Sequence, residues 1–120
     1  MNPTLRVPDH LAHIAQAMER IFRYVNSVDE ADFLHNELLQ DAVLRNFEII
    51  GEAANRILRG VPEFAAQHAH VPWLVMYTMR NRISHGYDTV DLPLVWQTIR
   101  QNLPALHAQI QALRAEMAQR

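Results

Sequence analysis

The hydrophobic residues of this chain recur at steps of three and four, which is the spacing of one face of an α-helix. The first such run extends from Asp9 to Val25, and Pro8 and Asp9 are typical residues for the start of a helix. Its apolar positions are Leu11, Ile14, Ala15, Met18, Ile21, Phe22 and Val25. The pattern predicts a long amphipathic helix at this end of the chain.

Two more helices are expected before the middle of the chain. Ser27 and Glu30 have the spacing of a capping box, which predicts a short helix that continues through Leu34. A longer helix is predicted from about Asp41 to Arg59, ended by Gly60 and Pro62. Gly51 lies inside it at a cost of about 1 kcal/mol relative to alanine, so we expect it to permit close helix packing.

The second half of the chain predicts two further helices. One begins at Trp73 and ends near His85, before Gly86. The other is capped by Asp91 and carries apolar residues as far as Met117. Pro104 lies inside that last pattern, so we expect a kink or a missing hydrogen bond there.

No segment of useful length alternates between apolar and polar residues, so strands are not expected. The length of 120 residues supports one domain, and the hydrophobic content of 49% is too high for a disordered chain. We therefore predict an all-α fold, a helical bundle of four to five helices that forms a single domain over residues 1–120.

Composition narrows the possible chemistry. The chain has no cysteine, which excludes disulfides, thiol nucleophiles and zinc ribbons. The net charge is −2, so no global positive field attracts nucleic acid. All 11 basic residues are arginine, so any basic contact to a phosphate comes from arginine or protonated histidine. Neither a signal peptide nor a membrane span is visible, which predicts a cytoplasmic protein.

The segment from Met79 to Asp88 is the richest in reactive side chains. It contains Arg80, Asn81 and His85, and Asn81 lies one helical turn below His85. Histidine transfers protons near neutral pH, and arginine holds a phosphate without titrating. Together they meet the minimum for metal-free RNA cleavage, with a symmetric dimer supplying both an acid and a base. A histidine and an arginine that merely bind the carbonyls of a helix end fit the spacing equally.

The remaining polar residues leave several interpretations open. The pairs His10/His13 and His68/His70 do not make the three or four ligands that zinc needs, so we predict no metal and no cofactor. Four charged residues on the third helix form either a solvated stripe or part of a cleft wall, and Asn46 and Asn55 are open in the same way. The four are Arg45, Glu48, Glu52 and Arg56. Trp73, Trp96 and Phe47 are expected in the core or in a dimer interface.

Arg80, His85 and Tyr87 follow the pattern arginine, four residues, histidine, one residue, tyrosine. This pattern resembles the signature of the HepT-like branch of HEPN-domain toxins. Further blocks that resemble the family are the helix from Asp41 to Ala54, Pro72-Trp73, the stretch from Tyr87 to Asp91, Val95-Trp96 and Leu103-Pro104. The resemblance extends from about Leu11 to Leu113.

The resemblance implies an α-helical, homodimeric ribonuclease toxin of a type VII-like toxin–antitoxin pair. Arg80 and His85 would be catalytic, facing their copies across a cleft, and Asn81 would orient His85 or contact RNA. The partner would be a minimal nucleotidyltransferase antitoxin that transfers AMP to Tyr87, in a hetero-oligomer with the toxin.

Other interpretations predict different behaviour. Tyr87 also suits an aromatic side chain that anchors the loop after the helix. The chain also suits a non-catalytic helical partner or regulatory subunit of a nucleotidyltransferase, or a nucleotide-binding HEPN module. Only the first interpretation predicts RNA cleavage.

Overall fold

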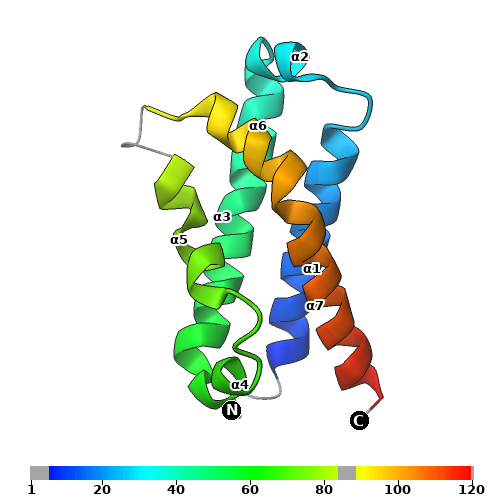
Figure 1. Ribbon diagram of the computed structural model, residues 1–120, viewed down its shortest axis with the longest axis vertical. Helices are drawn as coiled ribbons and strands as arrows, with labels where there is room; N and C mark the ends of the chain where they lie inside the picture. Colours follow the sequence, from blue (N-terminus) through cyan, green and yellow to red (C-terminus); the bar gives the residue numbers. More distant parts are fainter. Residues whose placement is uncertain (1–5, 84–88, 120) are drawn as a thin grey trace.

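The computed structural model describes residues 6–83 and 89–119. Every element of these two ranges is a helix, which confirms the all-α prediction. The helices are α1 (Val7–Tyr24), α2 (Glu30–Leu34), α3 (Glu37–Gly60), α4 (Pro62–Gln67), α5 (Trp73–Ile83), α6 (Leu92–Gln101) and α7 (Leu103–Ala118) (Figure 1).

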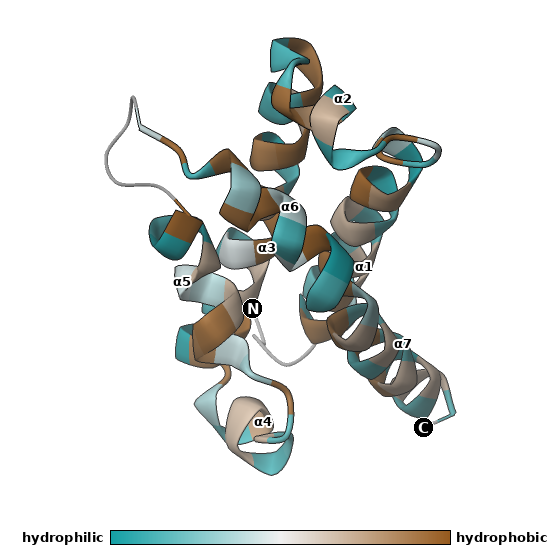
Figure 2. Cartoon of the chain, turned by 45° about the horizontal axis from the view of Figure 1, so that its top comes forward, coloured by the Kyte–Doolittle hydropathy of each residue, from teal (hydrophilic) through white to brown (hydrophobic). Residues whose placement is uncertain are grey.

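Helix α3 is the centre of the bundle. Helices α1 and α5 pack against it on different sides, α7 packs against α1, and α6 crosses in front of α3 (Figure 1). Brown apolar and teal polar residues both occur along the helices (Figure 2), and the buried apolar residues meet in one core. The core contains Phe47, Trp73 and Trp96, which were predicted to lie either in the core or in a dimer interface.

The short helix α2 is capped by a different residue from the one predicted. The carboxylate of Asp29 accepts the backbone N–H of Asp32 at 2.8 Å, and the carboxylate of Asp32 accepts the N–H of Asp29 at 3.4 Å. The prediction that Ser27 caps this helix is therefore wrong. Ser27 lies in the preceding turn with φ of 65°, a left-handed conformation that cannot begin a helix.

Helix α3 ends at Gly60 as predicted but begins earlier, at Glu37. Asn36 caps it, because its side-chain oxygen accepts the N–H of Leu39 at 3.0 Å. Helix α4 was not expected from the sequence, and it begins at Pro62, where a proline fits because the first turn needs no backbone donor.

The last predicted helix is two helices. Instead of a kink at Pro104, the chain breaks at Asn102, between α6 and α7. Pro104 then occupies the first turn of α7, where its missing N–H removes no helical hydrogen bond. Asp91 caps α6 as predicted, because its carboxylate accepts the N–H of Leu94 at 3.0 Å.

The described part of α5 ends at Ile83, and the predicted end of this helix at His85 and Gly86 lies outside the described residues. The backbone N–H of Asp91 donates to the carbonyl of Ile83 at 2.8 Å. This bond joins the last described residue of α5 to the start of α6, so the two ends of the interval 84–88 are anchored together.

Gly51 is the point of closest approach between α3 and α5. A Cβ atom at this position would lie 3.2 Å from the carbonyl oxygen of Tyr77, which is part of the α5 backbone. That contact is tighter than ordinary van der Waals contact, so a larger side chain would push the two helices apart. The expected role of Gly51 in close helix packing is confirmed.

We expect Gly51→Leu to lower the free energy of unfolding by about 1–3 kcal/mol, because the added side chain has no space against the α5 backbone. Gly60→Ala is the matched control, since nothing lies within 4 Å of the added methyl group at the end of the same helix. The control should be neutral or slightly stabilising. Denaturant unfolding of both variants at equal protein concentration tests this, and equal stabilities would contradict it.

Candidate functional site

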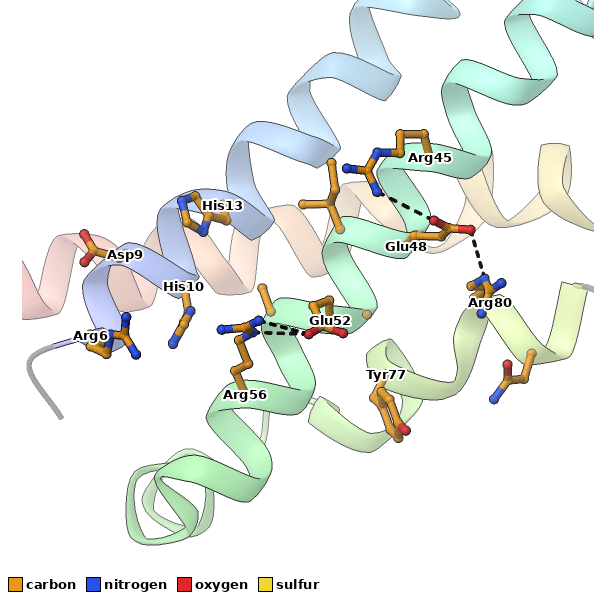
Figure 3. A pocket seen from close by; sticks show the side chains of 14 residues that line it. Arg6, Asp9, His10, His13, Arg45, Glu48, Glu52, Arg56, Tyr77 and Arg80 are labelled. Atoms are coloured by element: carbon orange, nitrogen blue, oxygen red, sulfur yellow. Dashed lines mark hydrogen bonds and ion pairs between the residues drawn. The ribbon is translucent and has the colours of Figure 1, made fainter. Parts of the chain in front are cut away.

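A groove of about 820 Å³ runs between α1 and α5, with α3 as its floor. Figure 3 shows side chains from all three helices along it. The groove exists because α3 packs against both other helices and holds their polar faces apart. Charged side chains from α3, from α5 and from the start of α1 converge in it.

Arg80 lies on the α5 wall of this groove, next to Asn81. Its Nε atom is 3.3 Å from Oε1 of Glu48 on α3, and 56% of its side chain is exposed. Arg80 and Asn81 are therefore placed together at the groove, as the motif requires. Arg82 is exposed and does not line the groove. His85 and Tyr87 lie outside the described residues.

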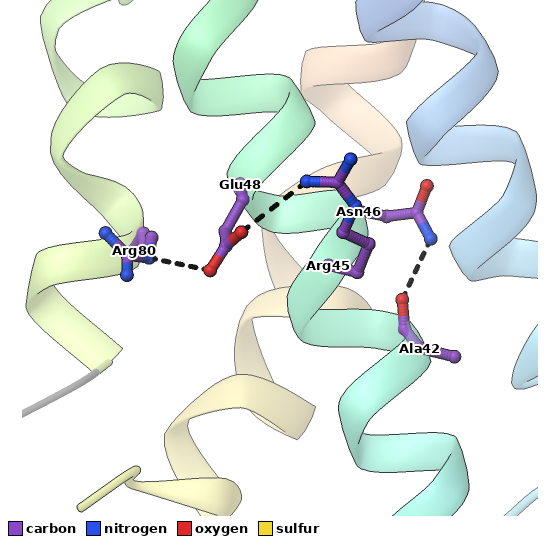
Figure 4. A network of polar contacts seen from close by, with 5 residues as sticks. All are labelled: Ala42, Arg45, Asn46, Glu48 and Arg80. Carbon is purple, nitrogen blue, oxygen red and sulfur yellow. Dashed lines mark hydrogen bonds and ion pairs between the residues drawn. The ribbon is translucent and has the colours of Figure 1, made fainter. Parts of the chain in front are cut away.

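Glu48 is shared by two arginines (Figure 4). Its other carboxylate oxygen, Oε2, is 3.7 Å from Nη1 of Arg45 on the same helix. Such exposed ion pairs contribute little to stability. The consequence of this network is geometric, because the carboxylate holds the guanidinium of Arg80 at the groove wall.

The charged residues of α3 face this groove. Arg45, Glu48, Glu52 and Arg56 all line it, so they are the wall of a concave site within one chain. Glu52 pairs with Arg56, whose Nη2 atom lies 3.2 Å away. The partnership of Glu48 with Arg80 was missed from the sequence, because residues 32 positions apart in two helices carry no spacing signal.

The two asparagines on α3 have structural roles. Asn46 is buried, donates to the carbonyl of Ala42 at 2.8 Å and accepts from Arg20 at 3.4 Å. Asn55 accepts from Nε of Arg59 at 2.8 Å. Neither lines the groove, so the possibility that they face a cleft with the catalytic residues finds no support within this chain.

The opposite wall is the start of α1, with Asp9, His10 and His13, together with Arg6 directly before this helix. The pKa of His10 is lowered below 6.5, first by partial burial and then by the positive charges of Arg56, His13 and Arg6, while Asp9 acts in the opposite direction. His10 is therefore neutral at pH 7. The sequence analysis considered these histidines as metal ligands and predicted no metal, and it did not place them at a groove, although their three-residue spacing puts them on one face of the helix.

Two further properties of the chain bear on other functions. Within residues 6–83 and 89–119, no three histidine, aspartate or glutamate side chains are close enough to hold a metal ion together. None of the helices in these ranges has both the length and the apolar character needed to cross a membrane.

Comparison with known proteins gives consistent matches. Residues 14–113 match the family model described as "Ribonuclease HepT-like". A protein of Thermococcus cleftensis named "Probable ribonuclease HepT" is 36% identical over 106 residues, which cover 88% of this chain and 94% of that protein.

Two other relatives carry similar names. A "Putative RNase" of Caldanaerobacter subterraneus subsp. tengcongensis is 33% identical over 87% of this chain and 90% of its own length. A "Gamma-glutamylcyclotransferase and putative RNase" of Methanocaldococcus jannaschii is 36% identical over 90% of this chain, which corresponds to 47% of that longer protein. No solved structure matches the chain significantly.

Proposed function

The chain belongs to the HepT-like ribonuclease family and is a ribonuclease, and we propose that it is the toxin of a type VII-like toxin–antitoxin pair. In this proposal it is a metal-independent RNA endonuclease that acts as a homodimer. A partner nucleotidyltransferase blocks its activity by transferring AMP to Tyr87.

The observation that carries the proposal is the position of Arg80. Its guanidinium is exposed on a groove wall and, among the residues that the structure describes, is paired with the carboxylate of Glu48. A phosphate that enters the groove can replace this carboxylate and form two parallel hydrogen bonds with the guanidinium. An arginine that only capped the end of its helix would not need a partner from α3.

The reaction follows from the chemistry of arginine and histidine. The 2′-hydroxyl oxygen of RNA attacks the adjacent phosphorus and gives its proton to a base, and the 5′-oxygen leaves with a proton from an acid. The products are a 2′,3′-cyclic phosphate and a 5′-hydroxyl. His85 supplies one of these proton transfers, and the His85 of a second copy supplies the other. Arg80 stabilises the charge that develops on the phosphorus-bound oxygens.

The outer surface of α5 supports the dimer. Leu74 and Val75 are 57% and 42% exposed there, one to two turns before Arg80 on the same helix. A second copy of the chain that covers these apolar side chains would bring two α5 helices together. The two motifs would then lie near one another, as a shared acid–base pair requires.

We expect His85→Ala and Arg80→Ala each to reduce RNA cleavage by about 10²-fold or more, because each removes one component of transition-state stabilisation. His35→Ala, an exposed histidine on the C-terminal side of α2, is the control and should cleave at the parent rate. Cleavage of a labelled RNA is measured in the presence of EDTA. Full activity of His85→Ala, or complete loss of the parent activity in EDTA, would contradict the mechanism.

We expect Leu74→Glu to convert the dimer into a monomer and to reduce RNA cleavage, because a charge replaces an apolar contact. Leu38→Glu is the control, since Leu38 is 81% exposed on α3, on a different helix from the motif. Light scattering gives the mass of each variant. A dimer that persists in Leu74→Glu would place the interface elsewhere on the molecule.

We expect the chain co-expressed with its nucleotidyltransferase to gain mass in nucleotide increments. The Tyr87 oxygen attacks the α-phosphorus of ATP, loses its proton and releases pyrophosphate. The added phosphodiester brings negative charge to the place where an RNA phosphate binds. Intact mass spectrometry should show no increment for Tyr87→Phe and the parent increment for Tyr24→Phe. An increment retained in Tyr87→Phe would exclude Tyr87 as the acceptor.

A further inference from the structure

The groove extends well beyond Arg80, and its far wall carries a second group of cations. His10 and His13 lie on α1, Arg6 directly precedes this helix, and Arg56 extends toward His10 from α3 (Figure 3). The proposed cleavage chemistry uses none of these four residues. Arg6 makes no ion pair with any other residue that the structure describes, and only Arg56 of the four is paired with a carboxylate.

The groove has a different charge balance from the rest of the chain. Four arginines and three carboxylates line it, so its charge is +1 with neutral histidines and +3 when both are protonated. The whole chain has a formal charge of −2. The concave surface that contains Arg80 is therefore more positive than the chain as a whole. Asp9, the carboxylate of the α1 wall, points away from Arg56 (Figure 3).

The partial burial of His10 among positive groups indicates a binding site for an external anion rather than an ion pair within the protein. His10 is partly buried among Arg56, His13 and Arg6, an arrangement that disfavours its own protonation. Clustering cations in this way costs electrostatic free energy, and the protein supplies too few carboxylates to neutralise them. Such a cluster is typical of a site for an external anion.

We propose that the α1 wall of the groove, formed by Arg6, His10 and His13 together with Arg56, binds phosphates of the RNA strand away from the bond that is cut. This inference rests on the proposed ribonuclease function and extends it from the cleavage site to the path of the substrate. The RNA strand enters along α1, crosses the α3 floor and reaches Arg80 on α5.

The dimensions of the groove fit this path. From Arg45 to Arg56 the groove follows about 16 Å of α3, which is long enough for several consecutive phosphates. Tyr77 lines the groove on the α5 side, with Arg59 stacked 5.7 Å from its ring centre. An aromatic ring beside a row of cations is the usual arrangement for single-stranded RNA, since bases stack on such rings.

Binding along this wall should depend on pH in a defined direction. A phosphate beside His10 offsets the charges of Arg56, His13 and Arg6 and raises the pKa of the histidine. RNA binding then takes up a proton, so the affinity rises as the pH falls from about 8 to about 6. The other charged groups around His10 are Asp9 on α1, which raises its pKa, and Glu52 on α3, which lines the same groove.

RNA binding without cleavage tests this inference. The full chain carrying His85→Ala is titrated against a fluorescent single-stranded RNA of about 16 nucleotides, and anisotropy gives the Kd at several salt concentrations. In this background the triple variant Arg6→Gln, His10→Gln, His13→Gln removes the α1 cations. Arg23→Gln, at the other end of α1 and outside the groove, is the matched control.

We expect the triple variant to raise the Kd about tenfold and to reduce the slope of log Kd against log salt by about 0.7 for each phosphate that the wall no longer neutralises. Its affinity should also depend less on pH than that of the parent. Arg56→Gln removes a cation from a different helix and should act in the same direction, which keeps the test valid if the triple variant folds poorly.

The outcomes separate this inference from the proposed function. In one outcome the parent binds and cleaves RNA, but the triple variant has the same Kd and salt slope as Arg23→Gln. This result would overturn the inference and leave the proposed function intact. In another outcome the triple variant keeps its RNA affinity but no longer forms a complex with the nucleotidyltransferase. This result would assign the groove to a protein partner and would also overturn the inference. A parent that binds no RNA would overturn both.

Discussion

The packing of α1 and α5 on opposite sides of α3 is the constraint on which the rest of the structure depends. Gly51 permits the close approach on the α5 side, since a Cβ atom there would make an unusually tight contact of 3.2 Å with the carbonyl oxygen of Tyr77. The groove is the space that this arrangement leaves between the two outer helices. A change in the separation of α3 and α5 would move Arg80 relative to Glu48, so packing in the core and geometry at the site are linked.

The ion pairs in the groove order its arginines but are weak. The carboxylates of Glu48 and Glu52 hold three arginines in place and keep them from repelling one another. Because these pairs are partly exposed, each is weak and can exchange with a phosphate at small cost. A deeply buried pair would have bound its arginine too firmly to release it to a substrate. Partial exposure of these ion pairs is therefore compatible both with ordering the arginines and with the anion binding that we propose.

The sequence predicted the fold class and most helix bounds, because apolar periodicity and caps such as Asp91 are local signals. It misplaced the cap of α2, where Asp29 and Asp32 form the capping box with the spacing assigned to Ser27 and Glu30. The break at Asn102 was also missed, since the apolar pattern continues through it without interruption. Arg80 was predicted as a site residue from its local motif, but the groove beside it was not predicted. The walls of the groove come from three helices far apart in the sequence, and no local pattern reports which polar faces they turn toward one another.

Because the chain has no lysine, the positive charge of the groove depends on arginine and histidine alone. Arginine stays charged at every pH at which the protein folds, so a groove lined by arginine alone would bind anions with constant strength. Histidines on the α1 wall change this, since each adds a charge only when a phosphate or a low pH favours its protonation. At neutral pH the free groove carries little net charge, which limits non-specific attraction of nucleic acid to a chain that is acidic overall. In the RNA path that we propose, the positive charge develops where a phosphate is already in place, so discrimination for a bound strand arises from protonation as well as from shape.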